Sequence, residues 1–398
     1  MLYIKGGKSV KTRKEHNIMQ NTCLDNYSTT FSSFPTIMSY HEEQDKNTRW
    51  VRCKVKDLQV EPLDKDSALY ADPSLFASGI SVDAVKDTAD NLGLAITLEG
   101  ETFPVRTTAY KSLLDRAKIG GTALPKLKRP VLAGVVNDCL KLFTSDALVL
   151  IRDEKIAAVH SGDATDYSVL PINRLLEALQ KKLDERFPGN QFEMGYTDHA
   201  ITSATWMMPN QKEELIGTYS KLLISKGDAK TAAKLMPGIR FMTSDTGISS
   251  AKVSALLLGS QHPIHIGGCI EVDHRNQRTV DEFEKALDQL FAQYEDGIKR
   301  LEALANVHLD YPVNAMTRVC KKLSMPKKAA LAAISIFEMV CGSGTATAHD
   351  VFLAMQEIPF NMKCDGTPEA KMIALEENMA RALRLNWKEY DLAKAVEY

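Results

Sequence analysis

The sequence has almost no excess charge of either sign and no long apolar run. Lys and Arg number 49, and Asp and Glu number 51, which gives a formal net charge of −2. No overall field therefore draws the chain onto nucleic acid, and any such contact must come from a local patch. A membrane-spanning helix needs about 18 or more apolar residues in a row, and no such stretch is present. The basic N-terminus lacks the apolar segment of a signal peptide, so we expect a cytoplasmic protein without membrane contact.

Patterned cysteines and abundant aromatic residues are also missing. The seven cysteines are scattered without a Cys-X-X-Cys pair. An odd, unpatterned set is typical of a reducing compartment and argues against a disulfide framework. Aromatic residues make up 7% of the chain, which leaves few platforms on which nucleic-acid bases could stack.

What is present is an ordinary globular composition, with 44% hydrophobic and 25% charged residues. The length favours two domains or one large one. Apolar residues alternate over 239–244, Asp245-Thr246-Gly247 is a turn signal, and an apolar strand resumes over 252–258. Pro263 after this strand favours an edge or a loop.

Helical spacing of apolar residues predicts a helix over 172–183 and a long helix over 279–306. Thr279 and Glu282 form a capping box at the start of the long helix. A helix of this length either packs across a sheet or pairs with another copy of the chain, so a homo-oligomer through 279–306 is one expectation. Shorter helices are expected over 327–341, 347–358 and 368–385.

These elements predict an α+β protein with a central antiparallel or mixed sheet flanked by helices. Residues 1–48 are polar with little periodicity, and we expect a disordered tail there. Met19 or Met38 is an alternative start within this tail. The α+β core domain is expected over 49–320, and a helical C-terminal segment over 321–398.

One cluster of side chains could bind a transition metal. His262, His265, Cys269 and His274 are ligand types within a short stretch, and a site could use two histidines with the cysteine. The spacing is not that of a known zinc motif, and the alternative is a set of polar loop residues with one buried cysteine. We expect no cofactor.

Two serines stand beside carboxylates, Ser161 near Asp163 and Ser244 next to Asp245. Nucleophilic catalysis would need a base next to the serine, and the chain has no Gly-X-Ser-X-Gly motif. Turn chemistry explains both pairs better. The sequence therefore favours a protein that is not an enzyme, without excluding one.

Basic residues gather at two proline-containing loops that precede helices. Lys126, Lys128 and Arg129 form the first group, and Lys327 and Lys328 form the second. Loops before helices commonly contact phosphates, although solvated protein surfaces carry such groups too. These five residues are the predicted nucleic-acid-binding surface, with single-stranded DNA as the candidate partner.

Three segments, 147–179, 238–258 and 346–357, together resemble the DUF932 family of phage- and plasmid-associated proteins. The first segment matches the family pattern at Arg152, Ser161 and Tyr167. The second segment matches the family pattern at Ser244, Asp245 and Gly247. The sequence departs from the family at Thr243, which replaces an asparagine, and at His274-Arg275, where the family has Arg-His. Cys269 also lacks the Asn-Gly that commonly follows it in the family.

The resemblance implies a mobile-element origin, a bacterial host cell, an α+β fold and no established activity. It favours a nucleic-acid-binding accessory factor of replication or recombination. By extension, the protein could be of the single-strand annealing type. Two alternatives remain open at this point. One is a metal-dependent enzyme that uses the 262–274 cluster, and the other is a structural or host-interaction protein.

Overall fold

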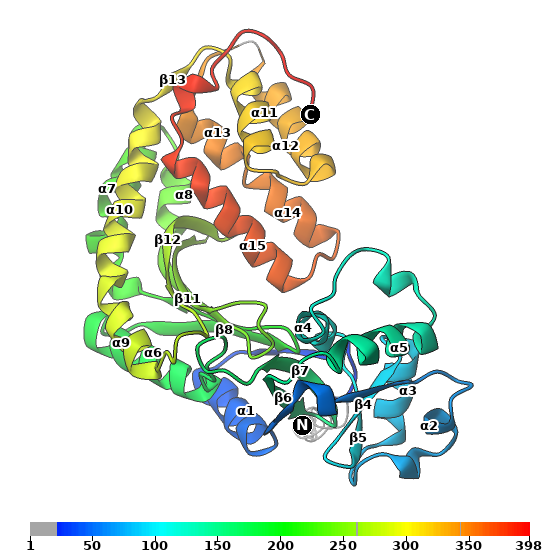
Figure 1. Cartoon of the computed structure of the whole chain (residues 1–398). Coiled ribbons are helices and arrows are strands. Elements are labelled where there is room, and N and C mark those ends of the chain that lie inside the picture. The colour runs from blue at the N-terminus through cyan, green and yellow to red at the C-terminus, as the bar shows by residue number, and fades with distance from the viewer. Residues whose placement is uncertain (1–21, 260–261, 343) are drawn as a thin grey trace, which may run out of the picture.

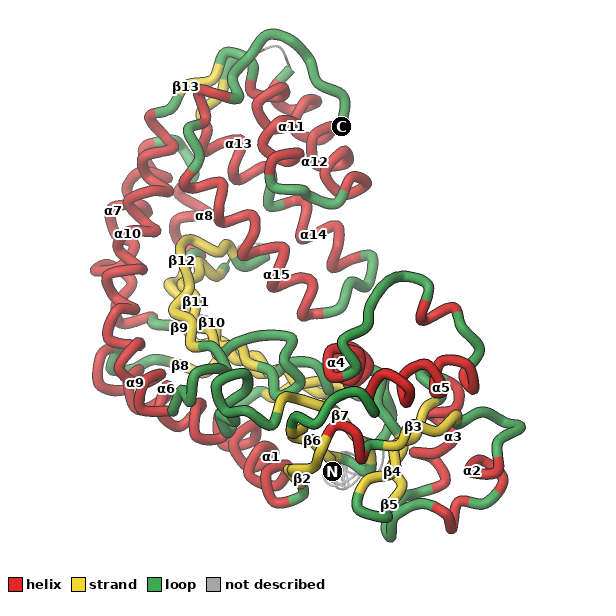
Figure 2. Tube along the Cα trace, in the orientation of Figure 1, coloured by secondary structure: helices red, strands yellow, loops and turns green. Residues whose placement is uncertain are grey.

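A six-stranded antiparallel sheet forms the centre of the molecule (Figures 1 and 2). The computed structural model describes residues 22–259, 262–342 and 344–398. The sheet order is β1-β8-β9-β10-β11-β12, and each neighbouring pair is antiparallel. Its strands are β1 Ser28–Phe31, β8 Gln191–Asp198, β9 Thr202–Met207, β10 Met236–Thr243, β11 Ala251–Leu258 and β12 Ile264–Val272. The predicted strands around the 245–247 turn are confirmed as β10 and β11, and β12, which follows Pro263, is an edge strand.

Helices cover both faces of this sheet, and the alternation along β10 shows which residues face which layer. Ile239 and Phe241 belong to the main apolar core, where the ring of Phe241 meets that of Phe283. Arg240 and Met242 point to the opposite face, toward the C-terminal helix α15. The helices of the first face are α1 Phe34–Lys46, α6 Ile172–Arg186, α7 Lys212–Ser225, α8 Ala229–Lys234, α9 Val280–Ala286 and α10 Leu290–Ala303.

The long helix expected over 279–306 is present as α9 and α10, joined by a short 3-10 turn, and the Thr279–Glu282 capping box is formed. Its apolar stripe packs across β11 and β12 of the same chain. Gly297 is where helix and strand touch, because a Cβ there would lie 2.3 Å from the carbonyl oxygen of Ile266. The stripe is therefore covered within the chain, and nothing in the structure favours self-association through it.

A smaller lobe is built from two three-stranded sheets, β2-β6-β7 and β3-β4-β5. The strands are β2 Arg49–Lys54, β3 Gln59–Pro62, β4 Leu94–Leu98, β5 Glu101–Pro104, β6 Asp146–Arg152 and β7 Lys155–Ser161. The helices are α2 Ala68–Ala71, α3 Val82–Asp90, α4 Ala109–Arg116 and α5 Arg129–Leu140. Residues 117–128 connect α4 to α5 and are called the α4–α5 loop below; the loop projects from the lobe toward the lower end of α15 (Figure 1).

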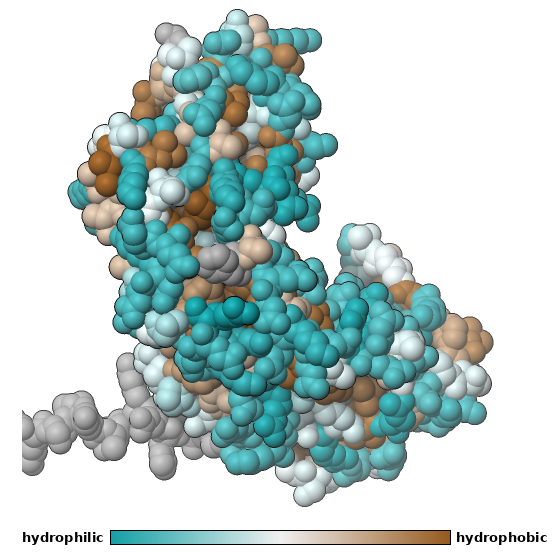
Figure 3. Space-filling view, turned by 90° about the vertical axis from the view of Figure 1, so that its left-hand side faces the viewer, coloured by the Kyte–Doolittle hydropathy of each residue, from teal (hydrophilic) through white to brown (hydrophobic). Residues whose placement is uncertain are grey.

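The C-terminal part is almost entirely helical, as expected (Figure 2). It contains α11 Pro312–Lys322, α12 Lys327–Cys341, α13 Ala348–Ala354, α14 Glu357–Cys364 and α15 Glu369–Ala380, with a small ladder of β13 His308–Leu309 and β14 Ala346–Thr347. Figure 3 shows the molecule hollowed between this upper, helical part and the part below it.

The expected α+β class is confirmed, but two boundaries differ. The core expected over 49–320 is two cores: one lies within residues 55–159, and the other joins the large sheet to the C-terminal helices. The C-terminal helices share that second core, so they are not a separate segment. Disorder over 1–48 is wrong for residues 28–46, because β1 pairs with β8 and α1 buries Ile37 and His41. Residues 1–21 of that tail lie outside the described residues. Within the described part, no helix is both long and apolar enough to cross a bilayer.

Candidate functional site

The residues that carry the family resemblance meet where the small lobe joins the large sheet. Arg152 ends β6, and Asp245 lies in the turn between β10 and β11. Arg152 Nη2 donates to Asp245 Oδ2 at 2.5 Å, and its Nε donates to Thr48 Oγ1 at 2.9 Å. The two side chains are 21% and 8% exposed. Burial alone lowers the pKa of Arg152, but the Asp245 carboxylate outweighs it and raises the pKa, so the guanidinium stays charged.

The main-chain carbonyl of Asp245 is held from the other side by an aromatic stack. The rings of His160 and Tyr167 lie parallel at 3.6 Å, and His274 continues the stack at 5.6 Å from Tyr167. Tyr167 Oη donates to this carbonyl at 2.9 Å, and His160 Nε2 donates to it at 2.8 Å. Burial lowers the pKa of His160 to about 4, so the ring is neutral at pH 7 and its single proton sits on Nε2.

Ser244 and Gly247 shape the turn and do not form a nucleophilic site. Ser244 Oγ donates to the carbonyl of Ala200 at 2.5 Å and accepts from the main-chain N–H groups of Thr246 and Ile248. Gly247 has a φ of +77°, which favours glycine. Ser161, at the end of β7, donates to Asp166 Oδ2 at 2.9 Å. Neither serine hydroxyl donates to a histidine, so the turn interpretation of both is the better one.

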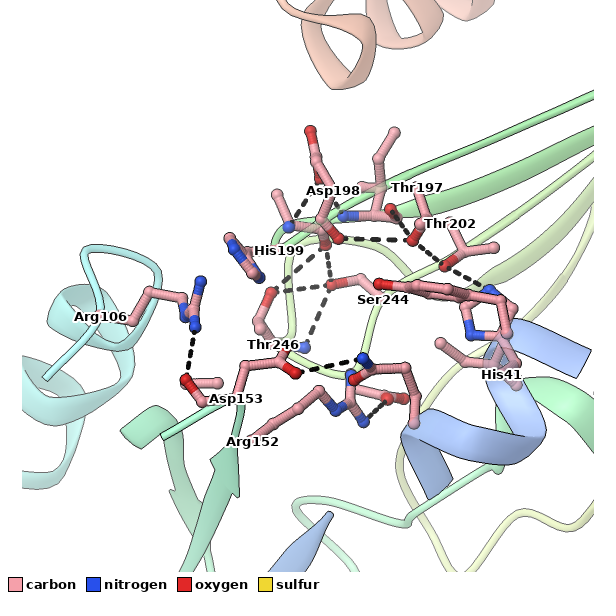
Figure 4. Close-up of a pocket in the computed structure, with 17 residues that line it drawn as sticks. His41, Arg106, Arg152, Asp153, Thr197, Asp198, His199, Thr202, Ser244 and Thr246 are labelled. Atoms are coloured by element: carbon pink, nitrogen blue, oxygen red, sulfur yellow. Dashed lines mark hydrogen bonds and ion pairs between the residues drawn. The ribbon is translucent and has the colours of Figure 1, made fainter. Parts of the chain in front are cut away.

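A cavity of about 30 Å³ lies beside the ion pair (Figure 4). Its volume accommodates about two water molecules. The labelled side chains in its wall are His41, Arg106, Arg152, Asp153, Thr197, Asp198, His199, Thr202, Ser244 and Thr246. Two arginines face three carboxylates when Asp245 is included, so the wall carries no positive surplus that would attract an anion.

Arg106 in this wall is 1% exposed, and within the described residues it donates to the carbonyls of Thr22, Leu24 and Asp153, at 3.3–3.4 Å. Burial lowers the pKa of His41 and of His199 to about 3. The cavity thus combines neutral histidines with balanced charges and contains no paired nucleophile and base. These features are typical of a polar interface between the two lobes rather than of a catalytic centre.

The four metal-ligand candidates are not brought together. Among the described residues, no group of three or more His, Cys, Asp or Glu side chains could hold a metal ion. His262 Nε2 lies 2.6 Å from Glu376 Oε1, His274 belongs to the aromatic stack, and Cys269 lies partly exposed on β12. His265 is buried, which lowers its pKa to about 4. The metal-site hypothesis is wrong because an extended strand separates residues 265 and 274 by about 30 Å along the chain.

A buried polar cluster takes the place of that metal site under α15. Arg240 of β10 donates to Glu376 of α15, which His262 also contacts. Burial would raise the pKa of Glu376, but Arg240 and His262 together lower it below its usual range. Lys252 of β11 reaches Glu377 at 3.1 Å. These pairs dock α15 onto the sheet.

The predicted nucleic-acid-binding residues fall in two parts of the molecule. Lys126 and Lys128 are exposed on the α4–α5 loop. Arg129 is turned inward instead, because its guanidinium donates to the carbonyls of Leu63 at 3.5 Å and Asn91 at 3.2 Å. The aspartates that share a surface depression with Lys128 and Arg129 are Asp64, Asp66 and Asp90.

Lys327 and Lys328 begin α12 in the upper, helical part (Figure 1). Lys328 is paired with Asp365 at 3.0 Å. The two groups of basic residues therefore do not form two edges of one surface, and only the α4–α5 loop keeps the features expected of a phosphate-binding site.

A second ion-pair centre, in the small lobe, was not predicted from the sequence. Lys155 is fully buried and donates to Asp25 at 2.9 Å and to Asp87 at 2.5 Å. It follows Asp153 and Glu154 in a hairpin turn, where charged residues are ordinarily exposed. One of its two partners, Asp25, belongs to the segment expected to be disordered.

Comparisons with protein-family models, with curated proteins and with solved structures found no match to the chain. The resemblance to the DUF932 family therefore remains a prediction.

Proposed function

We propose that this chain is a nucleic-acid-binding accessory protein that contacts phosphates through the α4–α5 loop. The observation that carries the proposal is a local excess of positive charge in a chain of net charge −2. Residues 105–141 contain eight Lys and Arg against two Asp. Phosphate contacts supply most of the sequence-independent affinity of nucleic-acid-binding proteins, so a local patch of this kind is sufficient for modest binding.

Three lysines of this segment are placed to act, namely Lys118, Lys126 and Lys128. All three are exposed. Some other lysines of the small lobe are engaged by aspartates, as Lys54 is by Asp146 and Lys65 by Asp90. By contrast, no ion pair engages the three loop lysines within 22–259, 262–342 and 344–398. Their ammonium groups can therefore meet phosphates without first breaking an intramolecular pair.

The loop is anchored, which limits the entropy lost on binding. Ile119 and Leu124 are partly buried against the core of the small lobe. Between them, Gly121 has a φ of +117°, a backbone conformation that glycine adopts readily and that is strained for other residues. The backbone thus holds the lysines outward near two anchored residues. Binding through a loop that is already ordered costs less conformational entropy.

The loop projects toward the lower end of α15 (Figure 1), and the molecule is hollowed below the helical part (Figure 3). A flexible single strand can follow such a hollow more readily than a stiff duplex. With few aromatic residues for stacking, binding to a single strand should depend mainly on phosphates and little on base sequence. Single-stranded DNA is the partner to test first, in keeping with the mobile-element setting that the resemblance implies.

The test is fluorescence anisotropy with a labelled oligonucleotide and the triple variant K118E/K126E/K128E. The matched control is K56E/K86E/K230E, which makes the same charge change at three exposed lysines outside the loop. We expect the loop variant to lose binding and the control to retain most of it. Both variants should melt close to the wild type, because exposed charges contribute about 0–1 kcal/mol each to stability.

Two outcomes would count against the proposal. If both variants lose binding equally, the interaction depends on total charge and the loop is not the site. If the loop variant binds like the wild type, the contacts lie elsewhere. A duplex of the same sequence, measured in parallel, shows whether the protein prefers a single strand.

A further inference from the structure

Helix α12 is apolar on both of its faces, although only one face is covered. Ala329, Ala330, Ala333, Ile334 and Phe337 are buried against the neighbouring helices. The large apolar side chains on the other face are Leu331, Ile336, Met339 and Val340, with exposed fractions of 43%, 42%, 76% and 82%. A helix that is apolar all round is normally covered all round, and a contiguous exposed apolar face marks an interaction surface.

The pattern along the exposed face is that of a helix-pairing seam. Lys328, Ala332, Ser335 and Met339 follow one another at spacings of four, three and four residues, which keeps them on one stripe of the helix. Leu331 and Ile336 lie on either side of this stripe. Small residues thus occupy the middle of the seam, where two helix backbones could come close, and larger ones surround them.

We propose that two copies of the chain associate by pairing α12 with α12 in antiparallel orientation about a two-fold axis. Such an axis, passing midway between Ala332 and Ser335, sets Ala332 of one copy against Ser335 of the second. It also lays Met339 over the aliphatic part of Lys328 of the second copy, an arrangement in which the ammonium group stays in water. The same surface of each copy meets itself, as closed two-fold association requires.

Charge complementarity selects this orientation over the parallel one. Lys327 and Glu338 are exposed and lie eleven residues, about three turns, apart on the same edge of the helix. Neither is engaged in an ion pair by any residue that the structure describes. In the antiparallel pair, Glu338 of each copy lies beside Lys327 of the other, which gives two reciprocal ion pairs. A parallel pair instead carries this edge on opposite sides of the seam in the two copies, so Lys327 and Glu338 meet no charge of the second copy and both ion pairs are absent.

The position of α12 in the fold leaves this surface accessible. The helix lies at the outside of the C-terminal helical part, on the side away from β12 (Figure 1). The earlier candidate for self-association, residues 279–306, packs its apolar stripe on its own sheet. The proposed surface on α12 has no such cover, and this inference does not depend on nucleic-acid binding.

The first test is the solution mass of the full chain, by sedimentation equilibrium or light scattering, over a range of concentrations. We expect twice the chain mass of 44.1 kDa at the upper end, about 100 µM. The M339K variant should raise the dimer dissociation constant by at least about 30-fold, because it sets a second lysine against Lys328 of the other copy at both ends of the seam. The control is L142K in the small lobe, where Leu142 is also 76% exposed; it should leave the mass unchanged. A wild-type chain that stays monomeric, or an M339K chain that still dimerises like the wild type, overturns the proposal.

The second test concerns orientation and uses only charge. K327E alone and E338K alone should each weaken the dimer about 3- to 10-fold, since two ion pairs become two repulsive contacts. The double variant K327E/E338K should return to within about 3-fold of the wild type, because the pairs are restored with their signs exchanged. Failure of the double variant to recover, with M339K still monomeric, rules out the antiparallel arrangement.

Discussion

The Arg152–Asp245 ion pair connects the small lobe to the large sheet, and breaking it should destabilise the protein strongly. R152M removes the only ion-pair partner of Asp245 found among the described residues. Asp245 is 8% exposed, so its carboxylate would remain buried without a countercharge. Removing one partner of a buried pair costs about 3–5 kcal/mol. The contacts of His160 and Tyr167 go to the main-chain carbonyl of Asp245, so side-chain substitutions isolate the ion pair.

The assay is urea unfolding followed by circular dichroism, with R174M as the control. Arg174 pairs with Glu177 on an exposed helix surface, where both side chains are more than 60% exposed; its loss should change the free energy of unfolding by less than about 1 kcal/mol. R152M/D245L removes both charges and should recover a substantial part of the stability that R152M loses. A free energy of unfolding for R152M within about 1 kcal/mol of wild type would refute the reasoning, since a buried carboxylate cannot lose its partner at so little cost.

Two further predictions concern glycine and pH. G297A should destabilise the protein by more than about 2 kcal/mol, because its Cβ would lie 2.3 Å from the Ile266 carbonyl. G134A, at an exposed position of α5 where a Cβ meets nothing within 4 Å, should instead stabilise the protein by about 0.5–1 kcal/mol. Thermal unfolding compares the two variants. Equal effects on stability would contradict the α10–β12 contact. Lowering the pH from 6.5 to 5 should reduce the free energy of unfolding by up to about 1.4 kcal/mol per pH unit for each buried histidine, because the unfolded chain takes up protons near pH 6.5 and the folded chain does not. Urea unfolding at several pH values checks this, and no change over that range would contradict the neutral, buried state of these rings. The histidines concerned, with pKa values lowered by burial to about 3 or 4, are His41, His160, His199 and His265.

Elements whose pattern is local could be predicted from the sequence, and those that depend on distant pairing could not. β10, β11 and the long helix follow directly from their periodicity, since each buries a regular face. β1 and α1 were missed because the segment 28–46 buries only two side chains and β1 is stabilised by pairing with β8, more than 160 residues away. The division into two cores could not be predicted, because residues of the larger core, from Ile37 to Trp387, lie on both sides of the smaller one along the chain.

The same distinction holds for the site. Arg152 and Asp245 are 93 residues apart, and only the family resemblance singles out both of them in the sequence. Lys155 and Arg106 have the appearance of ordinary exposed charges in the sequence, yet both are buried by contacts with residues 22–25. His265 and His274 are close in sequence but not in space, because an extended strand separates its residues faster than a helix does.

The most direct test of the proposed function is the salt dependence of oligonucleotide binding by the wild-type chain. Each phosphate contact on a single strand lowers the logarithm of the binding constant by about 0.7 per log unit of salt. Three engaged lysines therefore predict a slope near −2, measured by anisotropy from about 50 to 200 mM salt. No detectable binding at about 50 mM salt, or a slope near zero, would contradict a phosphate-binding role for the α4–α5 loop.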